Sequence, residues 1–211
     1  MGQLECNIRA QNETRANLYR LLSLYYYEPE KELIDKRALS FLAAEMAQVC
    51  PEGAKYAAEL TEEANIGEIE DLRIDYAKLF VGPFDLLAPP YGSVYLEKRR
   101  RVMGESTLDA LRCYQEAGLT MDRYFMEAPD HIAAELEFMY YLSFQDLDNE
   151  SVERQKYFLE HHLGAWVEDF TALVEERAET NFYRHLARIT RLFVNADQVY
   201  LEKLLIDLPV R

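Results

Sequence analysis

Residues 127–139 read EAPDHIAAELEFM, and the fold is decided here more than in any other stretch. Pro129 suits the first position of a helix, where its missing N–H would have no partner within the helix. Asp130 follows in the expected first turn, where the positive end of the helix dipole favours a carboxylate. The chain beyond His131 is mainly apolar. We therefore predict a buried helix over residues 129–147 with an ionisable pair at its mouth.

Helical periodicity extends over most of the chain, because apolar residues recur at three- and four-residue spacing between Pro and Gly breaks. The spacing predicts further helices over residues 10–27, 33–49, 54–64, 66–80, 96–103, 108–117, 152–177, 181–193 and 198–208. Gly164 lies inside the longest of these, and Asn195 is the expected cap of the last. No alternating strand pattern is present. The sequence predicts an all-α fold, a multi-helix bundle forming a single domain over residues 1–211.

Residues 81–95 interrupt this pattern with an irregular loop. The loop contains the helix breakers Gly82, Pro83, Pro89, Pro90 and Gly92, and the apolar or aromatic residues Phe84, Leu86, Leu87, Tyr91, Val94 and Tyr95. An apolar irregular loop has to pack on something, and such loops are often functional. Core filling between helices and a groove for an apolar peptide both stay open, as does a weak division of the domain at this loop.

The composition limits the partners and the compartment. Among 211 residues, 38 are acidic and 23 basic, and the net charge of −15 argues against nucleic acid or an anionic membrane as the main partner. An acidic chain attracts basic partners. There is no export signal and no apolar run of about 20 residues. The three cysteines are scattered without metal-ligand spacing, so we expect a cytoplasmic chain with free thiols.

The charges are unevenly distributed. Residues 127–179 contain 14 acidic and three basic residues, which fits either two solvated helix faces or a surface that steers a cationic peptide toward Asp130. The basic cluster KRRR at residues 98–101 is interpreted as a solvated helix face, because four charges fall short of a nucleic-acid surface.

An enzymatic interpretation has little support, because the common catalytic and phosphate-binding motifs are absent. His131 and Glu135 lie four residues apart on one face of the predicted helix, and Glu127 precedes them by four residues. These three are the candidate ligands of a metal-dependent hydrolase, although the helix itself supplies only two of them. The simpler interpretation of Asp130 and His131 is a helix-start carboxylate beside a histidine satisfied in the core.

Three motifs, taken in order, resemble one known family. They are Tyr76-x-x-Leu79-Phe80-Val81-Gly82-Pro83, Pro89-Pro90-x-Gly92-Ser93-Val94-Tyr95-Leu96 and Glu127-x-x-Asp130-His131-x-x-x-Glu135-Leu136-x-Phe138-Met139. Their order and spacing are similar to those of the TorD/DmsD family of cytoplasmic chaperones, within the wider group of nitrate reductase assembly chaperones. His162-Leu163-x-x-Trp166-x-x-x-Phe170 is a further matching element.

The resemblance implies an all-helical, non-enzymatic chaperone without a cofactor of its own. Such proteins hold the apo-form of a molybdenum oxidoreductase and cover its twin-arginine signal peptide until the molybdopterin cofactor is inserted, before export by the Tat translocase. Tat or cofactor-biosynthesis proteins are further implied partners, and the chain would be a monomer or homodimer. The peptide-binding positions that carry over are Tyr76, Phe80, Phe84, Pro89, Pro90, Tyr91, Gly104, Asp130 and His131, completed by Glu127 and Glu135 of the third motif.

The residues and the resemblance lead to the same hypothesis. A twin-arginine leader has a di-arginine head, which suits an acidic helix mouth, and an apolar segment, which suits an aromatic loop. The alternatives are the metal-dependent hydrolase and an assembly factor that binds only the folded enzyme subunit. The identity of the client, nucleotide binding, and whether residues 81–95 meet Asp130 and His131 in space stay open at this level.

Overall fold

The computed structural model describes residues 3–32, 34–63, 69–82, 86–97, 102–145 and 148–207. Within these residues the chain forms helices and no strand beyond one bridged residue pair, which confirms the predicted all-α class. The elements are α1 (Gln3–Tyr25), α2 (Lys36–Val49), α3 (Pro51–Glu63), α4 (Ile69–Tyr76), the π-helical turn η1 (Ala77–Val81), α5 (Gly92–Leu96), α6 (Glu105–Glu116), α7 (Ile132–Ser143), α8 (Asn149–His161), α9 (Leu163–Arg177) and α10 (Asn181–Asp207).

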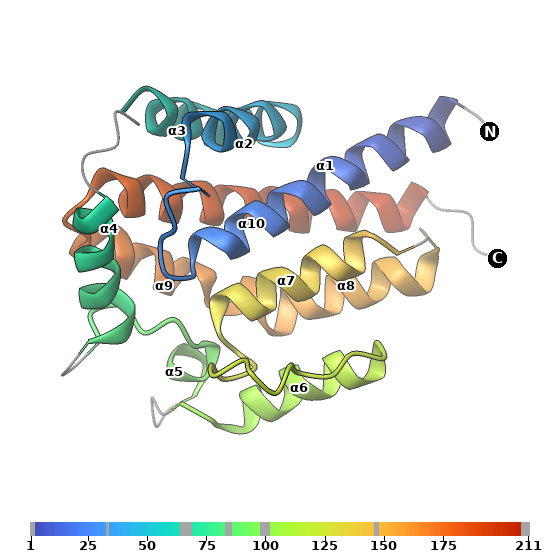
Figure 1. Ribbon diagram of the computed structural model, residues 1–211. Coiled ribbons are helices and arrows are strands. Elements are labelled where there is room, and N and C mark those ends of the chain that lie inside the picture. Colours follow the sequence, from blue (N-terminus) through green and yellow to red (C-terminus); the bar gives the residue numbers. More distant parts are fainter. Residues whose placement is uncertain are drawn as a thin grey trace.

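The two long helices α1 and α10 run through the middle of the molecule, and the other helices pack around them (Figure 1). Helix α1 packs along α7, and α10 packs along α9 with further contacts to α3 and α8. The α2–α3 pair covers one side of the molecule, and α5 and α6 lie on the opposite side (Figure 1). Buried side chains from before and after residues 81–95 belong to one continuous core. None of the described helices is both long and apolar enough to cross a membrane.

Helix α7 is apolar around most of its circumference and is correspondingly enclosed. It contacts α1, α8 and α9. Its buried residues are Ile132, Ala133, Ala134, Glu135, Leu136, Phe138, Met139, Leu142 and Ser143. A helix with apolar residues on all faces is stable only inside a protein. Glu137 is the exposed residue in the middle of this helix, and it therefore marks the strip of α7 that faces solvent.

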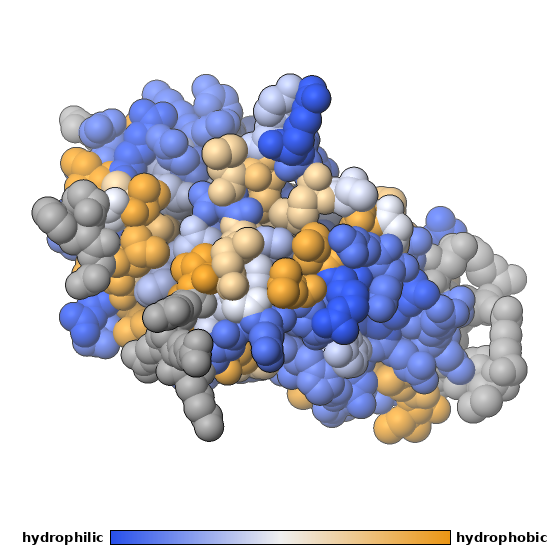
Figure 2. Space-filling model, turned by 90° about the horizontal axis from the view of Figure 1, so that it is seen from below, coloured by the Kyte–Doolittle hydropathy of each residue, from blue (hydrophilic) through white to orange (hydrophobic). Residues whose placement is uncertain are grey.

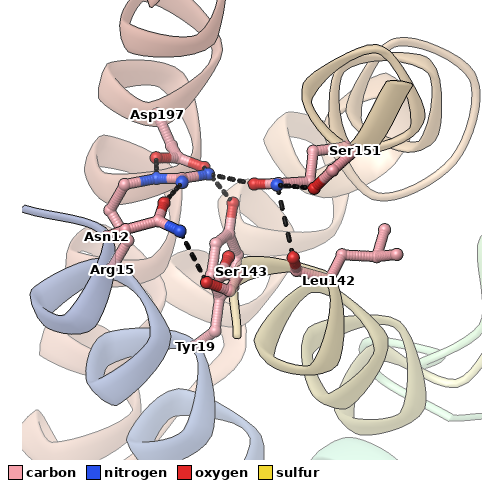
Figure 3. A network of polar contacts seen from close by, with 8 residues as sticks. Asn12, Arg15, Tyr19, Leu142, Ser143, Ser151 and Asp197 are labelled. Atoms are coloured by element: carbon pink, nitrogen blue, oxygen red, sulfur yellow. Dashed lines mark hydrogen bonds and ion pairs between the residues drawn. The ribbon is translucent and has the colours of Figure 1, made fainter. Parts of the chain in front are cut away.

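A buried ion pair joins α1 to α10 (Figure 3). The guanidinium of Arg15 donates to both carboxylate oxygens of Asp197, and the Tyr19 hydroxyl donates to Asp197 Oδ2 over 2.6 Å. Both charged side chains are almost completely removed from solvent. Because a buried charge without a partner is very unfavourable, this pair fixes how α1 lies on α10.

The same network extends from Arg15 to α7 and α8. Arg15 donates to Gln155 Oε1 over 2.7 Å, and the Asn12 amide, which also accepts from Arg15, donates to the carbonyl of Ser143 over 2.6 Å. Gln155 in turn donates to the carbonyl of Leu142 over 3.3 Å. The free carbonyls at the C-terminal end of α7 are thus satisfied from two other helices. This holds α1 and α7 side by side, and those two helices carry the site described below.

The start of α7 corrects one prediction. The helix begins at Ile132 with His131 as its N-cap, so Pro129 and Asp130 precede it and do not form its first turn. The preference of Pro129 for a first helical position is overridden because residues 130–132 pair instead with the loop at residues 90–92.

The predicted helix over residues 152–177 is wrong, since the chain forms two helices, α8 and α9. The backbone leaves the helical conformation at His162, where φ is −124° and ψ is −108°. A β-carbon on Gly164 would lie 2.4 Å from the carbonyl oxygen of Leu159. This close passage between the two helices therefore requires glycine.

Two other predicted boundaries are also wrong. The helices expected over residues 181–193 and 198–208 are one helix, α10, which ends at Asp207 and has Asn195 inside it. This continuity places Asp197 against Arg15. A short helix, α5, runs from Gly92 to Leu96 within the predicted loop, and Glu97 after it is extended. Of the helix expected over residues 96–103, residues 98–101 lie outside the described part of the chain.

Candidate functional site

The loop at residues 81–95 and the start of α7 meet in space. Tyr91 and His131 form an antiparallel bridge. The Gly92 N–H donates to the Asp130 carbonyl over 2.9 Å, and the Ile132 N–H donates to the Pro90 carbonyl over 2.9 Å. Two segments almost forty residues apart in the sequence are therefore joined by backbone hydrogen bonds.

Asp130 strengthens this junction from inside. Its side chain is 1% exposed, and Oδ2 accepts from the backbone N–H of Ser93 over 2.7 Å. Ser93 lies in the first turn of α5, so the carboxylate satisfies a helix N–H that has no partner within the helix. Asp130 is thus an N-terminal cap for α5 and not, as the sequence suggested, a first-turn residue of its own helix.

His131 lies between two tyrosines. Its Nδ1 accepts from the Ala133 N–H over 3.2 Å, which caps α7 and leaves Nε2 to carry the proton of the neutral ring. The ring stacks on Tyr27 at a centroid distance of 6.3 Å and meets the edge of Tyr91 at 5.4 Å. Burial lowers the pKa of His131 to about 4, against the opposing effect of Glu127 and Asp130. The imidazole is therefore neutral at pH 7.

Three carboxylates surround these tyrosines. The Tyr91 hydroxyl donates to Glu127, and the Tyr27 hydroxyl donates to Glu137 Oε1 over 3.0 Å. Burial, together with Glu127 and Glu28, raises the pKa of Tyr76 to about 12. Glu28, Glu127 and Glu137 are all exposed. We call the set Tyr27, Tyr76, Tyr91, Glu28, Glu127 and Glu137 the tyrosine–carboxylate patch.

A groove of about 440 Å³ adjoins this patch. Its walls come from α1, α7, the end of α6 and the connector at residues 119–125, and they include Leu24, Tyr114, Leu119, Met121, Phe125, Ala134, Phe138, Tyr140 and Tyr141. Glu137 belongs to both the patch and the groove, and the ring of Tyr27 contacts Phe125 at 6.3 Å. We call this cavity the α1–α7 groove. An acidic end thus continues directly into a mainly apolar channel.

Apolar side chains are also exposed around the connector and α6. Figure 2 shows hydrophobic groups among hydrophilic ones on the face formed by α5 and α6. Exposed members of this region are Leu96, Val102, Met103, Leu108, Tyr124 and Met126. The basic cluster at residues 98–101 lies outside the described residues.

The other predicted aromatic residues lie behind the patch. Tyr76 is half-buried at the end of α4, and its ring contacts that of Phe80 at 5.3 Å. Phe80 lies in the π-helical turn and is 4% exposed, packed against Tyr183 and Phe170. A π-helical turn of this kind is frequent at functional sites. Phe84 lies outside the described residues.

Pro89 and Pro90 contribute to the structure through their backbone carbonyls, and Gly104 through its lack of a side chain. The carbonyl of Pro89 accepts from the Tyr95 hydroxyl over 2.9 Å, and that of Pro90 accepts from α7 as described above. Gly104 precedes α6, and a β-carbon there would lie 2.0 Å from an oxygen of Glu97. Pro90 therefore lies at the junction with α7. Gly104 lies against Glu97, which does not belong to the tyrosine–carboxylate patch.

Glu135 lies in the core. It is 0% exposed, and its Oε2 accepts from Trp166 Nε1 over 2.9 Å. Burial raises the pKa of Glu135 well above its usual range, which favours the neutral carboxyl group. Glu127 is exposed and bonded to Tyr91, and His131 Nδ1 is occupied by a backbone N–H. The three residues considered for a metal-dependent hydrolase therefore do not form a common ligand group.

Sequence reasoning missed Tyr27, Glu28 and Glu137. Nothing in the local pattern marks Tyr27, which belongs to the turn after α1 and reaches His131 only through the fold. Glu137 carried a signal that was overlooked. A carboxylate in the middle of an otherwise apolar helix has to reach solvent, and it therefore identifies the open strip of α7.

Comparison with known proteins places these observations in a family. A family model described as the nitrate reductase delta subunit matches residues 42–172. The chaperone protein TorD of Shewanella loihica is 28% identical over 201 residues, covering 88% of this chain and 92% of the relative. The Tat proofreading chaperone DmsD of Salmonella typhimurium is 27% identical over 170 residues, covering 81% of each chain.

A solved structure agrees with these relatives. It is a crystal structure from Archaeoglobus fulgidus, described as a candidate redox enzyme maturation protein. The sequence identity is 26%, the TM-score is 0.55, and the match covers 89% of this chain and 93% of the other.

Proposed function

Because the chain belongs to the nitrate reductase delta subunit family, which includes the TorD and DmsD chaperones, we propose that it is a cytoplasmic chaperone for a molybdenum oxidoreductase. The family is one of chaperones and not of enzymes. In this proposal the chain binds the twin-arginine signal peptide and the apo-form of its client, assists insertion of the cofactor and prevents premature export by the Tat translocase.

The observation that supports this function best is the continuity of the tyrosine–carboxylate patch with the α1–α7 groove. Glu127 and Glu137 each accept one tyrosine hydroxyl and are exposed. A carboxylate has about four acceptor positions, so both can still bind a guanidinium group. The groove next to them offers aromatic and aliphatic side chains to an apolar segment. A peptide with arginines followed by apolar residues matches this order.

The predicted site residues have different roles in this proposal. Tyr76, Tyr91 and Glu127 are half-buried or exposed and would contact the leader. Asp130, His131, Pro90, Phe80 and Glu135 are buried, so we propose that they maintain the shape of the site. Phe84, Pro89 and Gly104 stay proposed contacts on the strength of the family resemblance.

The direct test is titration of a synthetic twin-arginine leader peptide against Glu127→Gln and Glu137→Gln. Hydrogen bonds to charged groups contribute about 1.5–3 kcal/mol, so each substitution is expected to weaken binding about 10-fold or more. Glu150→Gln is the matched control, because Glu150 is exposed on α8 and pairs only with Arg154 among the contacts described. Equal affinity of all three variants would refute the assignment of the patch.

Four further comparisons test the proposal against its alternatives. A leader with lysines in place of both arginines should bind more weakly to wild type, because lysine cannot form the bidentate pair. Affinity should fall with added salt, since part of the attraction is long-range. Asp130→Ala and His131→Ala should weaken binding through the shape of the site. If leaderless precursor is captured as well as full-length precursor, the chain is instead an assembly factor that binds the folded subunit.

A further inference from the structure

Asp109, Cys113 and His162, none of which lines the α1–α7 groove, come together in the fold. Asp109 and Cys113 lie four residues apart on one face of α6, and His162 lies at the break between α8 and α9. His162 Nε2 is 3.2 Å from Asp109 Oδ2 and 3.8 Å from Cys113 Sγ. All three potential ligand atoms lie within 4.8 Å of one another. This cluster brings nitrogen, sulfur and oxygen donors to one point.

The spacing of these atoms suits one tetrahedral metal ion. With Zn–N of about 2.0–2.1 Å, Zn–S of about 2.3 Å and Zn–O of about 2.0–2.2 Å, neighbouring ligand atoms in a tetrahedral site lie roughly 3.3–3.6 Å apart. The two distances to His162 Nε2 fall on either side of that range. The oxygen of Asp109 and the sulfur of Cys113 lie within 4.8 Å of each other, so these two atoms would approach by up to about 1 Å when the geometry is completed. Imidazole, thiolate and carboxylate together favour zinc over magnesium or calcium.

The neighbouring residues hold the ligands in position. Arg112 donates to Asp109 Oδ1 over 2.8 Å, which leaves Oδ2 directed at the histidine. The His162 ring stacks on Phe158 at 4.7 Å and is 2% exposed. Its Nδ1 has no hydrogen-bond partner within the described part of the chain. In the metal-free protein the Nε2–H of the neutral ring donates to Asp109 Oδ2, and metal binding would move the ring proton to Nδ1 and free the Nε2 lone pair.

We propose that Asp109, Cys113 and His162 form a binding site for a zinc-class divalent transition-metal ion, with the fourth position open to water. Asp109 and Cys113 are half-buried, so an ion can enter from solvent. The three ligands come from α6 and the α8–α9 junction. A bound ion would therefore link α6 to the α8–α9 junction.

The protonation states are compatible with this role. Burial lowers the pKa of His162, so the ring is neutral at pH 7. Burial and then Asp109 raise the pKa of Cys113 to about 11, so the thiol keeps its proton until a metal displaces it. Binding forms the metal–sulfur bond and releases that proton to solvent. No oxidant or reductant is required.

Cobalt(II) and zinc(II) titrations of the full chain, made without a histidine tag, test the proposal. Cobalt should bind in a 1:1 ratio with the intense thiolate-to-metal charge-transfer absorption of a cysteine-ligated ion, and zinc should displace it. Cys113→Ser should abolish this absorption and weaken binding at least 10-fold, and Asp109→Asn should weaken binding while keeping the absorption. Cys6→Ser is the matched control, because Cys6 is an exposed free thiol, and it should behave as wild type.

Thermal unfolding gives a second, independent readout. Zinc should raise the melting temperature of wild type and Cys6→Ser but not that of Cys113→Ser, because only a ligand of the folded state stabilises it. Circular dichroism of each variant establishes that it is folded before titration. Metal binding of Cys113→Ser equal to that of wild type, or a cobalt spectrum without the thiolate band, would overturn the proposal. Neither result depends on leader-peptide binding.

Discussion

The buried pair Arg15–Asp197 offers the sharpest test of how this fold is held together. We consider Asp197→Asn, which keeps the shape of the side chain and removes its charge. Arg15 is fully buried and would then be a charge without a counter-ion. Removal of one partner from a buried pair costs about 3–5 kcal/mol. For a chain of this length about 1 kcal/mol corresponds to 2–4 °C, so we expect the melting temperature to fall by roughly 6–20 °C.

Two further variants serve as references for the loss of stability expected of Asp197→Asn. Glu150→Gln breaks the exposed pair with Arg154, for which about 0.3–0.5 kcal/mol is expected, and should change the melting temperature by no more than about 2 °C. The double variant Arg15→Met with Asp197→Leu replaces both charges by apolar groups of similar size. It should recover most of the lost stability, because a well-packed apolar replacement of a buried pair is often neutral or better.

The assay is urea unfolding at pH 7, with thermal scans as support. If Asp197→Asn loses less than about 1 kcal/mol, as the surface control does, then Arg15 is not held as a buried charge and the reasoning fails. The result would also matter for the site. The network positions α1 beside α7, so a folded Asp197→Asn chain should bind the leader peptide more weakly than Glu150→Gln does.

Three smaller predictions concern the residues around the site. The wild-type protein should lose stability as the pH falls from 6.5 to about 4, because the His131 ring resists protonation in the folded state, and His131→Gln should reduce this loss by up to about 3 kcal/mol. Unfolding measured at both pH values tests this. Part of the loss should remain, because the pKa of His162 is also lowered. Glu135→Gln should remove the opposite slope, a loss of stability as pH rises above about 4.3, since burial raises the pKa of this carboxyl in the folded state. An unchanged profile would contradict the raised pKa. Gly92→Ala should cost about 1–3 kcal/mol, because its β-carbon would lie 2.9 Å from Trp166 Nε1, and a stability equal to wild type would disprove this crowding.

The sequence alone predicted the helical class and most of the helices. Apolar spacing of three to four residues is a local property, so α2, α3, α6 and α7 follow from it within a few residues, whereas α1 begins at Gln3 and not at the predicted residue 10. The aromatic-rich loop and the pair at Asp130 and His131 were also recognisable, because Pro, Gly and ionisable residues stand out against an apolar background. The family resemblance rested on the same residues.

The boundaries that failed have tertiary causes. Nothing local ends a helix at His162 or starts one at Ile132. The first depends on the close passage of Gly164 beside Leu159, and the second on backbone hydrogen bonds to the loop at residues 90–92. Asn195 is a good cap in isolation, yet α10 continues through it, and that continuity places Asp197 beside Arg15.

The sequence by itself therefore determined which segments are helical and which residues are chemically unusual. Only the tertiary structure decided which of those residues meet. It brought Tyr27 from the end of α1 onto His131, gave Asp130 a partner in α5, and buried Glu135 against Trp166. It also joined Asp109 and Cys113 to a histidine about fifty residues away. Helix periodicity is a pattern over three or four residues and can be read from the sequence. A site is made by contacts between distant segments, and their separation in sequence does not indicate their distance in space.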